Sequence, residues 1–460
     1  MALSIVAIKT KPGRGRAARP WRARALDVCR VSAIVAAVMA PASTAATSIA
    51  TVVFLVSLIV SGAALQVVSD AFRLPAGKGI VAFLALVLAS ALLNDAGVRA
   101  AIPDLWAWRK VAFVYLALPL FSADVWKRRL VLSVFWAFAA LLAMSYVSLA
   151  GWIPTRDVSP MLARGVVMTN YAAQGVALAV AALLGASLAQ SARARWRWIY
   201  ALLCAAFIVN VLFFGPGRTG YLAIAALGLL WALLSGGWRT AFAAAGGLAI
   251  LAAIAFAVSP TFKPRLAVGW EEMQHAEEAR TETSMGIRLL FAQNALALIA
   301  ERPLLGYGLG SFKRVYADYV ASRYTGVKAT PSGDPHNQYL YVLFEQGAVG
   351  LAVFLFMIGS LFVTFPRDHY GRLAACVLTA WCLTSVFSSH FRTYPEGHFY
   401  AFVVAGLGGA ARRRPGAFTG ARDDRVHRDR ASRHQVASHA DPRMLLEYSS
   451  GVRFSFESRS

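Results

Sequence analysis

The stretch TAFAAAGGLAILAAIAFAVS, residues 240–259, contains no charged side chain and consists almost entirely of small or apolar residues. An α-helix rises about 1.5 Å per residue, so about 20 such residues cross the ~30 Å hydrocarbon core of a membrane. Similar apolar runs recur along the chain between short charged breaks, and 58% of its 460 residues are hydrophobic. The runs lack the alternation typical of a membrane barrel. We therefore predict an all-α polytopic membrane protein.

Twelve such runs predict about 12 transmembrane helices. They cover residues 29–41, 45–65, 78–93, 108–122, 128–150, 167–190, 196–214, 219–236, 240–259, 337–365, 371–389 and 397–411. The connections are short except for residues 260–336, between the ninth and tenth helices, which are too polar to span a membrane. This loop contains an amphipathic stretch from Ile287 to Ala300. We predict a large extramembrane lid with one or two helices of its own.

The net charge of +23 is concentrated at the two ends of the chain. Residues 1–30 hold eight Lys or Arg against one Asp, and residues 411–460 hold eleven Arg against six acids. Basic segments beside helix ends suit topology signals and anionic membrane lipids better than a nucleic acid, which we exclude as a partner. The predicted parts are a basic cytoplasmic N-terminus at 1–28, a transmembrane domain at 29–411 with its lid at 260–336, and a basic, disordered cytoplasmic tail at 412–460.

The cysteines indicate neither a disulfide framework nor a metal site. All four lie in or beside apolar runs, and no two of them form a CxxC motif: Cys29, Cys204, Cys376 and Cys382. Such cysteines are typically buried small hydrophobes. A second apolar run directly follows the first, and a long basic region precedes it, so we do not expect a cleaved secretory signal.

The distribution of Lys and Arg predicts the orientation in the membrane. Cytoplasmic loops carry an excess of both residues. With the N-terminus inside, the inner connections contain Arg73, Lys78, Lys127, Arg128, Arg129, Arg193, Arg195, Arg197, Arg239, Arg367 and Arg372. Both termini are then cytoplasmic, and the lid is on the outer, periplasmic side. Several ionisable residues fall on that outer side, beside helix ends: Arg218, Arg288, His336, His390, Arg392, Glu396 and His398.

The segment Gly215-Pro-Gly-Arg-Thr-Gly220 precedes and opens the predicted eighth helix. Gly217 and Gly220 allow close backbone approach, and a helix start offers free N–H groups with a partial positive charge. Arg218 adds a guanidinium whose donors match phosphate oxygens. The segment is a candidate anion site. The alternative is a tight turn whose Arg218 reaches lipid head groups.

His336 directly precedes the tenth helix, in the segment Asp334-Pro-His-Asn-Gln-Tyr-Leu340. A neutral His can take a proton from a sugar hydroxyl near pH 7, which is the role of a general base. Asn337 would help to fix the approach of His336; the alternative is that His336 only caps the helix. Glu345, further along the same helix, either orients a partner or is a packed polar residue, and we favour packing.

Three further segments are candidates for supporting roles. Gly306, Gly308 and Gly310 lie in a loop that follows a helix rather than a strand, so it is a weak nucleotide motif but can shape a pocket beneath the lid. His390, Arg392 and His398 close the outer side of the last helix pair. Glu271, Glu272 and His275 have helical spacing that could suit a metal, but a solvated helix face explains them better, and we predict no metal site.

The order of these motifs resembles the O-antigen ligase/polymerase family of bacterial envelope glycosyltransferases. The resemblance rests on Arg218 among glycines, Arg288 before the glycine loop, and His336 followed by Glu345, with the long outer loop between helices nine and ten. It implies transfer of a glycan from an undecaprenyl-diphosphate carrier to a hydroxyl acceptor on the periplasmic side of the inner membrane. It also implies inversion, without a metal or other cofactor. Arg218 and Arg288 would hold the diphosphate, and His336 would deprotonate the acceptor.

The acceptor separates the members of this group. A ligase transfers finished polymer to lipid A-core in lipopolysaccharide biosynthesis, a polymerase extends a growing glycan on carrier lipid, and a third relative glycosylates protein. We favour the ligase because the outer loop before His336 is single and large. A lipid or polysaccharide transporter is the alternative from another class, but transporters usually place ionisable residues near mid-membrane.

Overall fold

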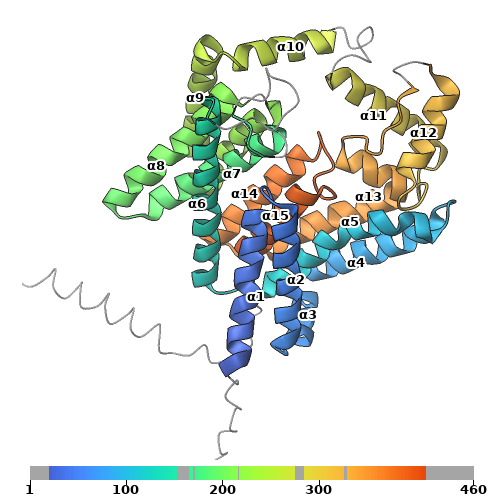
Figure 1. Cartoon of the computed structure of the whole chain (residues 1–460), viewed down its shortest axis with the longest axis horizontal. Helices are drawn as coiled ribbons and strands as arrows, with labels where there is room; N and C mark the ends of the chain where they lie inside the picture. The colour runs from blue at the N-terminus through green and yellow to red at the C-terminus, as the bar shows by residue number, and fades with distance from the viewer. Residues whose placement is uncertain are drawn as a thin grey trace, which may run out of the picture. The chain divides into compact units, whose positions relative to one another are not determined.

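The computed structural model describes residues 20–152, 165–168, 171–215, 217–274, 284–325 and 329–410. The predicted tail and most of the basic N-terminus lie outside these residues. Every regular element in the described part is helical (Figure 1). The α-helices are α1 (Pro20–Met39), α2 (Thr44–Val60), α3 (Ala64–Phe72), α4 (Pro75–Ser90), α5 (Val98–Ala117), α6 (Asp124–Leu149), α7 (Tyr171–Ser191), α8 (Ala194–Val209), α9 (Arg218–Val258), α10 (Phe262–Gln274), α11 (Ser284–Glu301), α12 (Phe312–Arg323), α13 (Gln338–Thr364), α14 (His369–Thr384) and α15 (Tyr394–Gly408). Short 3₁₀-helical turns follow α4 and α5, and a short π-helical turn follows α8. They are η1 (Ala91–Leu93), η2 (Leu118–Phe121) and η3 (Asn210–Phe214).

Several helices begin at residues that satisfy or remove a free backbone N–H group. Ser43 accepts a hydrogen bond from Ala46 N before α2, and Asp368 accepts one from Gly371 N before α14. Pro75 opens α4, where its missing N–H costs nothing. The polar breaks between the apolar runs therefore act as helix starts.

All twelve predicted runs lie in helices, with some differences at their ends. The predicted helix at 45–65 ends at Val60, and α3 follows after a bend of 100°. The predicted helix at 108–122 begins earlier, as α5 starts at Val98. Gly237, with φ 76°, breaks α9 between the two runs that the sequence predicts as separate helices. A positive φ is readily available only to glycine, so the break lies at this residue.

Two helices, α7 and α15, are buried along most of their length. Helix α7 packs against α6, α8 and α9, while α15 packs against α1, α5, α6 and α14. Alanine and glycine are frequent on α7, and such small residues let helix backbones approach closely. Helices α4 and α13 form a further closely packed pair beside α5.

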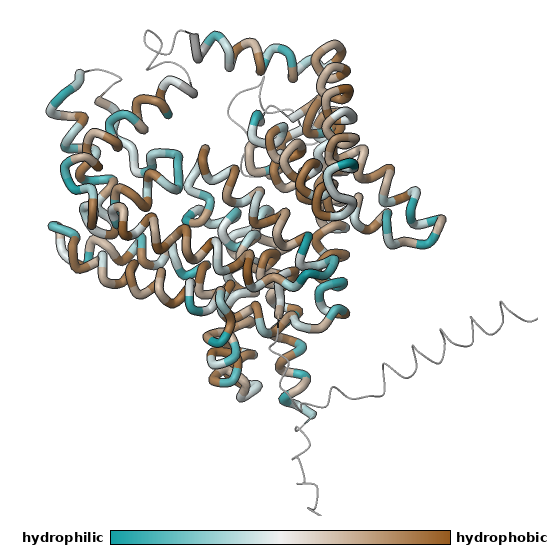
Figure 2. Tube along the Cα trace, turned by 180° about the vertical axis from the view of Figure 1, so that it is seen from behind, coloured by the Kyte–Doolittle hydropathy of each residue, from teal (hydrophilic) through white to brown (hydrophobic). Residues whose placement is uncertain are grey.

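The outer faces of the helices carry large apolar side chains. Six described helices are long and apolar enough to cross a membrane, or seven if α2 and α3 form one bent span. Figure 2 shows hydrophobic residues along the helices and hydrophilic residues mainly at their ends and in the loops. An apolar outer surface of this extent suits lipid rather than water. The chain is an all-α membrane protein; the count of 12 spans stays a prediction.

The lid contains three helices in its described part, α10, α11 and α12, where one or two were predicted. Helix α10 runs from the end of α9 at the top of Figure 1. Helices α11 and α12 pack against the first part of α13 through a separate apolar cluster. This cluster includes Phe291, Ala295, Leu298, Ile299, Tyr307, Phe312, Tyr316, Val320, Tyr341 and Phe344. The third helix was missed because its buried residues are spaced among Lys and Arg.

Candidate functional site

His336 lies at the junction between the lid and α13, in an unusual backbone conformation. Its φ of 55° is the only positive φ of a non-glycine residue in the described part of the chain. Its backbone N–H donates to Asp334 Oδ1 at 2.7 Å. Its ring stacks on Phe291 of α11, with 5.9 Å between the ring centroids. Contacts with two lid segments therefore fix the place of His336.

Arg288 lies one helical turn before Phe291 on α11 and acts electrostatically on His336. Burial has the largest effect and lowers the pKa of the His336 imidazole below its usual value. The Asp334 carboxylate opposes this decrease, and the Arg288 guanidinium adds to it. The imidazole is therefore neutral near pH 7, as a proton acceptor must be. Arg288 and His336 are therefore near enough for their charges to interact.

The side chain of Asn337 caps α13. Its Oδ1 accepts hydrogen bonds from Tyr339 N at 2.9 Å and Leu340 N at 3.1 Å. The next residue, Gln338, is fully buried and donates its backbone N–H to Ser385 O at 2.8 Å. Asn337 therefore supports His336 by fixing the start of the helix that follows it.

The glycine loop closes a break in α13. Gly347, with φ 64°, interrupts that helix, and the loop supplies partners for the backbone there. Gly308 N donates to Glu345 O, and Tyr307 N donates to Phe344 O. A Cβ on Gly306, whose φ is 69°, would collide with Phe344 O and the Glu345 backbone. Gly306, Gly308 and Gly310 therefore serve the close approach of this loop to α13, to the end of η1 and to α5.

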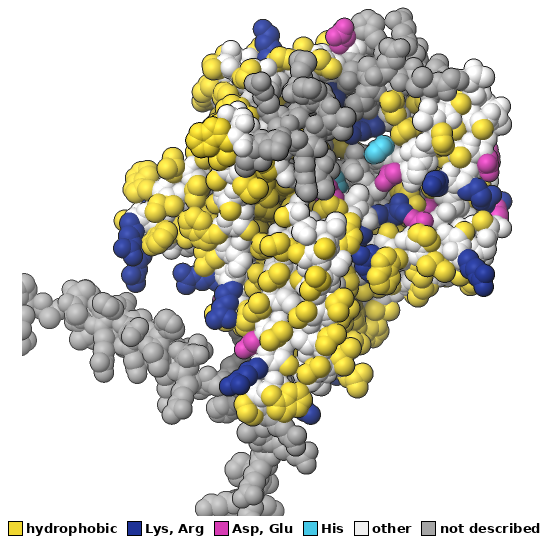
Figure 3. Space-filling model, viewed as in Figure 1, with side chains coloured by type: hydrophobic (Ala, Val, Ile, Leu, Met, Phe, Trp, Pro, Cys, Tyr) yellow, Lys and Arg dark blue, Asp and Glu magenta, His cyan; other side chains and the backbone are white. Residues whose placement is uncertain are grey.

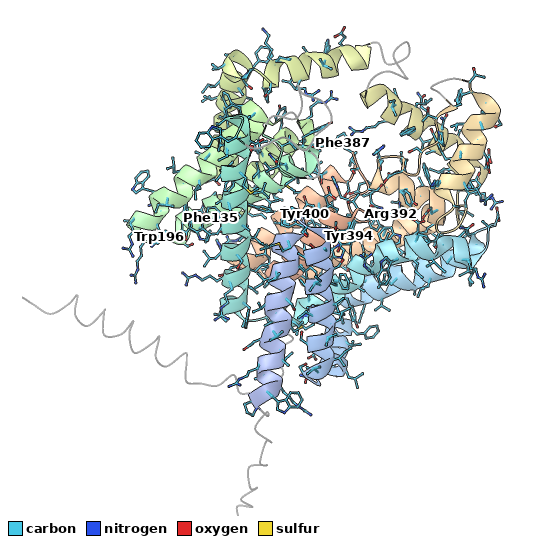
Figure 4. All side chains as sticks on the ribbon, viewed as in Figure 1. Phe135, Trp196, Phe387, Arg392, Tyr394 and Tyr400 are labelled. Carbon is cyan, nitrogen blue, oxygen red and sulfur yellow. The ribbon has the colours of Figure 1, made fainter. Side chains whose placement is uncertain are left out.

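Glu345 belongs to a buried polar network below the lid. Its Oε1 accepts the Gly310 N–H at 2.9 Å and lies 2.7 Å from the Tyr341 hydroxyl. The Tyr341 hydroxyl is also 3.2 Å from Asp104 Oδ1 on α5. Arg392 forms an ion pair with Asp104 and lies over the Tyr341 ring (Figure 4). Glu345 is therefore a packed polar residue, as favoured above, and Arg392 belongs to the same network.

Asp104 and Lys110 were not among the predicted site residues. Both belong to α5, and the Lys110 ammonium donates to the Arg392 carbonyl while only 1% of the residue is exposed. The available signal was a Lys at the start of a predicted apolar span, where a partner is required. That partner lies 282 residues further along the chain, so spacing alone could not identify it.

His390 and His398 occupy different surroundings from His336. His398 lies on α15, where its Nδ1 is 2.7 Å from Tyr394 O and its ring packs near Phe113. His390 is 6% exposed, and its Nδ1 has no hydrogen-bond partner among the described residues. It lines a cavity of about 20 Å³ with Glu396 and Tyr400, which is room for about one water. His398 is a core residue, while His390 faces a small, mainly apolar cavity.

Arg218 begins α9, and its side chain reaches α10. A Cβ on Gly269 of α10 would collide with the Arg218 guanidinium, so these two residues are in close contact. Gly217 and Gly220 face α7: a Cβ on Gly220 would meet Gly175, and one on Gly217 would meet Tyr171 O. The close approach that these glycines allow is therefore between helices, and Arg218 is left at the edge of the lid.

An open, mainly apolar cavity of about 530 Å³ lies between α9 and α10. Arg218 and Lys263 supply the charged part of its wall, and the rest comes from Phe256, Leu266, Ala267, Gly269 and Trp270. Arg265 is a third cation in this region, since Arg218 and Arg265 both act electrostatically on Tyr221. Apolar walls with a few charged groups suit an amphipathic anion. Lys263 was not predicted, although Arg265 two residues later repeats its positive charge.

Figure 3 shows a hollow on one face of the molecule, in which a histidine lies among acidic and basic side chains. Among the described residues, no group of three His, Cys, Asp or Glu could hold a metal ion. Of the acidic set considered for a metal, Glu271 is exposed, whereas His275 and the side chain of Glu272 lie outside the described part.

Residues 205–355 match the family model described as O-antigen ligase. This region contains Arg218, Arg288, His336 and Glu345, with the whole lid between them. This part of the chain is therefore similar to the O-antigen ligase family. The resemblance seen in the order of the motifs is thereby confirmed. Together with the apolar helices, this similarity supports a location in a bacterial inner membrane.

The O-antigen ligase of Salmonella typhimurium (strain LT2) is 31% identical over 148 residues. The aligned part covers 31% of this chain and 34% of that protein. The match thus spans about a third of the relative's length, as the family domain spans about a third of this chain. His390, Arg392 and His398 lie after the family match, so it does not bear on them.

Proposed function

We propose that this protein is a membrane glycosyltransferase that moves a glycan from undecaprenyl diphosphate to a hydroxyl acceptor on the periplasmic face. We further propose that the acceptor is lipid A-core, which makes the reaction O-antigen ligation. The observation that carries the proposal is that the half-buried His336 stacks on Phe291, one helical turn after Arg288, inside the O-antigen ligase region. This arrangement supports the proposal because it would offer a cation for a phosphate near a base for a hydroxyl.

The proposed reaction is a single displacement with inversion. The acceptor oxygen attacks the anomeric carbon, the bond from that carbon to the diphosphate breaks, and the bonding electron pair leaves with the polyprenyl diphosphate. His336 takes the proton of the acceptor hydroxyl. Negative charge builds on the leaving diphosphate, so the guanidinium groups of Arg288 and Arg218 would lower the barrier by stabilising that charge.

The α9–α10 cavity supports a lipid-linked donor. Its apolar walls suit a prenyl chain, and Arg218 with Lys263 suits the phosphates at the end of that chain. Helices α10 and α11 pack against each other, which is what a diphosphate shared between Arg218 and Arg288 requires of the lid. We therefore also propose that Arg218 and Arg288 contact the same diphosphate.

The proposed orientation places the lid in the periplasm and both termini in the cytoplasm. It rests on the excess of Lys and Arg in the loops opposite the lid. Cysteine labelling can test it, with a single cysteine introduced at Ser322 in the lid or at Ser191 on the opposite side. A reagent that does not cross the membrane should label the first in whole cells and the second only after lysis. The reverse pattern overturns the periplasmic site.

Reconstitution tests the activity directly. Purified protein in liposomes, given a lipid-diphosphate glycan and lipid A-core, should produce glycan-modified lipid A-core and free polyprenyl diphosphate. Activity in excess EDTA tests the proposed independence from metals. Loss of transfer that Mg²⁺ restores would contradict it.

A polymerase gives a different result in the same vesicles. It would join repeat units on the carrier lipid and leave lipid A-core unmodified. In cells, a deletion strain that still modifies lipid A-core with long polymer but accumulates single repeat units would favour the polymerase. Transfer to a protein acceptor alone would favour protein glycosylation.

A further inference from the structure

The Asp334 carboxylate joins the lid to the loop between α14 and α15. Its Oδ1 accepts hydrogen bonds from the His336 backbone N–H and from the Ser389 hydroxyl, each at 2.7 Å. The first bond passes over Pro335, and the second connects residues 55 positions apart. One oxygen atom therefore holds both the backbone of His336 and a loop that follows the family domain in the sequence.

The backbone of His336 needs such an external constraint. A non-glycine residue with φ 55° is strained, and strain of this kind persists only where the surroundings determine the conformation. Asp334 binds the N–H of His336 on one side, and the Asn337 cap fixes α13 on the other. A different backbone conformation would turn the imidazole away from Phe291 and Arg288.

We propose, building on the glycosyl transfer proposed above, that Asp334 is a positioning residue for His336. Its carboxylate holds the backbone that carries the imidazole and stabilises the imidazolium that forms when the acceptor hydroxyl loses its proton. Through Ser389, it also ties that base to the α14–α15 loop. The lid must then be docked on the α14–α15 loop before His336 is correctly placed.

The charged groups around His336 support this role. Arg288 acts from α11 and disfavours the imidazolium, while Asp334 acts from the lid and favours it. Asp334 also favours the charged form of His390, which acts from the α14–α15 loop. Burial lowers the pKa of both histidines. The Asp334 carboxylate thus opposes the effects that would make His336 too weak a base.

Asp334→Asn separates the charge from the hydrogen bonds, because the amide oxygen can still accept both of them. Loss of the charge should lower the pKa of His336, so the acid limb of the pH–rate profile moves to lower pH. Transfer near pH 7 should fall because the base is weaker, but by less than the ~10²–10⁴-fold that loss of a general base costs. Asp334→Ala, which loses both bonds as well, should reduce transfer further.

Two other variants separate the contributions. Ser389→Ala removes only the tether to the core, so it should lower transfer without moving the acid limb. Asp318→Asn is the matched control, because Asp318 is an exposed carboxylate on α12. It should leave both rate and profile unchanged. A profile and rate in Asp334→Asn that equal those of wild type would overturn the positioning role.

A chemical readout makes the test independent of glycosyl transfer. Diethyl pyrocarbonate modifies the neutral imidazole, so the modification of His336, followed by peptide mass spectrometry against pH, reports its titration. Its midpoint should shift to lower pH in Asp334→Asn but not in Asp318→Asn. If wild type transfers no glycan while the midpoint shifts, the proposed function fails and the coupling of Asp334 to His336 stands. An unchanged midpoint with active wild type refutes the coupling alone.

Discussion

The surroundings of His336 and those of Arg218 differ in how enclosed they are. At His336, hydrogen bonds and a ring stack fix the residue between Asp334, Phe291 and α13. At Arg218, the guanidinium reaches a Gly269 surface beside an open apolar cavity with a second cation, Lys263. Fixed geometry suits a proton transfer, whereas an open apolar wall suits a long lipid.

This difference assigns two halves of one substrate to two parts of the lid. The α11 side would act on the sugar and the acceptor, and the α10 side would hold the lipid and its phosphates. Substitutions on the α11 side should therefore change the rate and its pH dependence. Those on the α10 side should change the dependence on the donor lipid.

The largest expected effect is that of His336→Ala. Loss of the general base should reduce transfer by about 10²–10⁴-fold while the protein still accumulates in the membrane. In wild type, the acid limb should lie below pH 6.5, because the pKa of His336 is lowered and the base must be neutral to act. His369→Ala serves as a control, since His369 lies at the start of α14 and bonds Ser187. Wild-type transfer by His336→Ala would remove this residue from the mechanism.

The next largest effect is expected from Arg218→Ala. Loss of one donor to a developing charge costs about 10²–10³-fold in rate. Arg239→Ala is matched to it, because Arg239 lies on the same helix beyond the break at Gly237. It should transfer normally. Steady-state rates at several donor concentrations provide the measurement; equal rates in the two variants would refute an Arg218–phosphate contact.

A smaller effect should follow from Trp270→Ala, which removes an apolar wall of the α9–α10 cavity. Transfer from a full-length polyprenyl donor should fall several-fold, because burial of apolar surface contributes about 25 cal/mol per Å². A short-chain donor that does not fill the cavity should be less affected. Trp238→Ala, beyond the break in α9, should not change the rate of transfer from either donor. If both donors lose equally, the cavity does not hold the prenyl chain.

The helical body was largely predictable because a bilayer demands long apolar helices, and these are visible in any one run. The bend after Val60, the early start of α5 and the helix α12 were not predictable, since tertiary packing determines them. In the candidate site, the sequence was informative for one pair of residues. The order of Arg288 and His336 was informative, and the structure places the two near each other.

Pairings over long separations were not predictable from spacing. Asp104 and Lys110 meet Arg392 through contacts that span more than half of the chain. The glycine loop looked like a pocket loop, but its partner is the break in α13 about 40 residues later. Such roles depend on which helices become neighbours, and no local pattern encodes that choice.

The smallest effect on chemistry, with a clear effect on stability, is expected from Gly306→Ala. A residue with a Cβ is strained at φ 69°, and a Cβ at this position would also collide with Phe344 O. We therefore expect the free energy of unfolding to fall by about 1–3 kcal/mol. The thermal unfolding midpoint in detergent should fall, while transfer per folded molecule below that midpoint stays close to wild type. Gly359→Ala on α13 is the control, because a Cβ there meets no atom within 4 Å. A rate that falls without any change in the unfolding midpoint would show that the loop contacts substrate. In that case, the division between a structural loop and a reactive His336 would have to be redrawn.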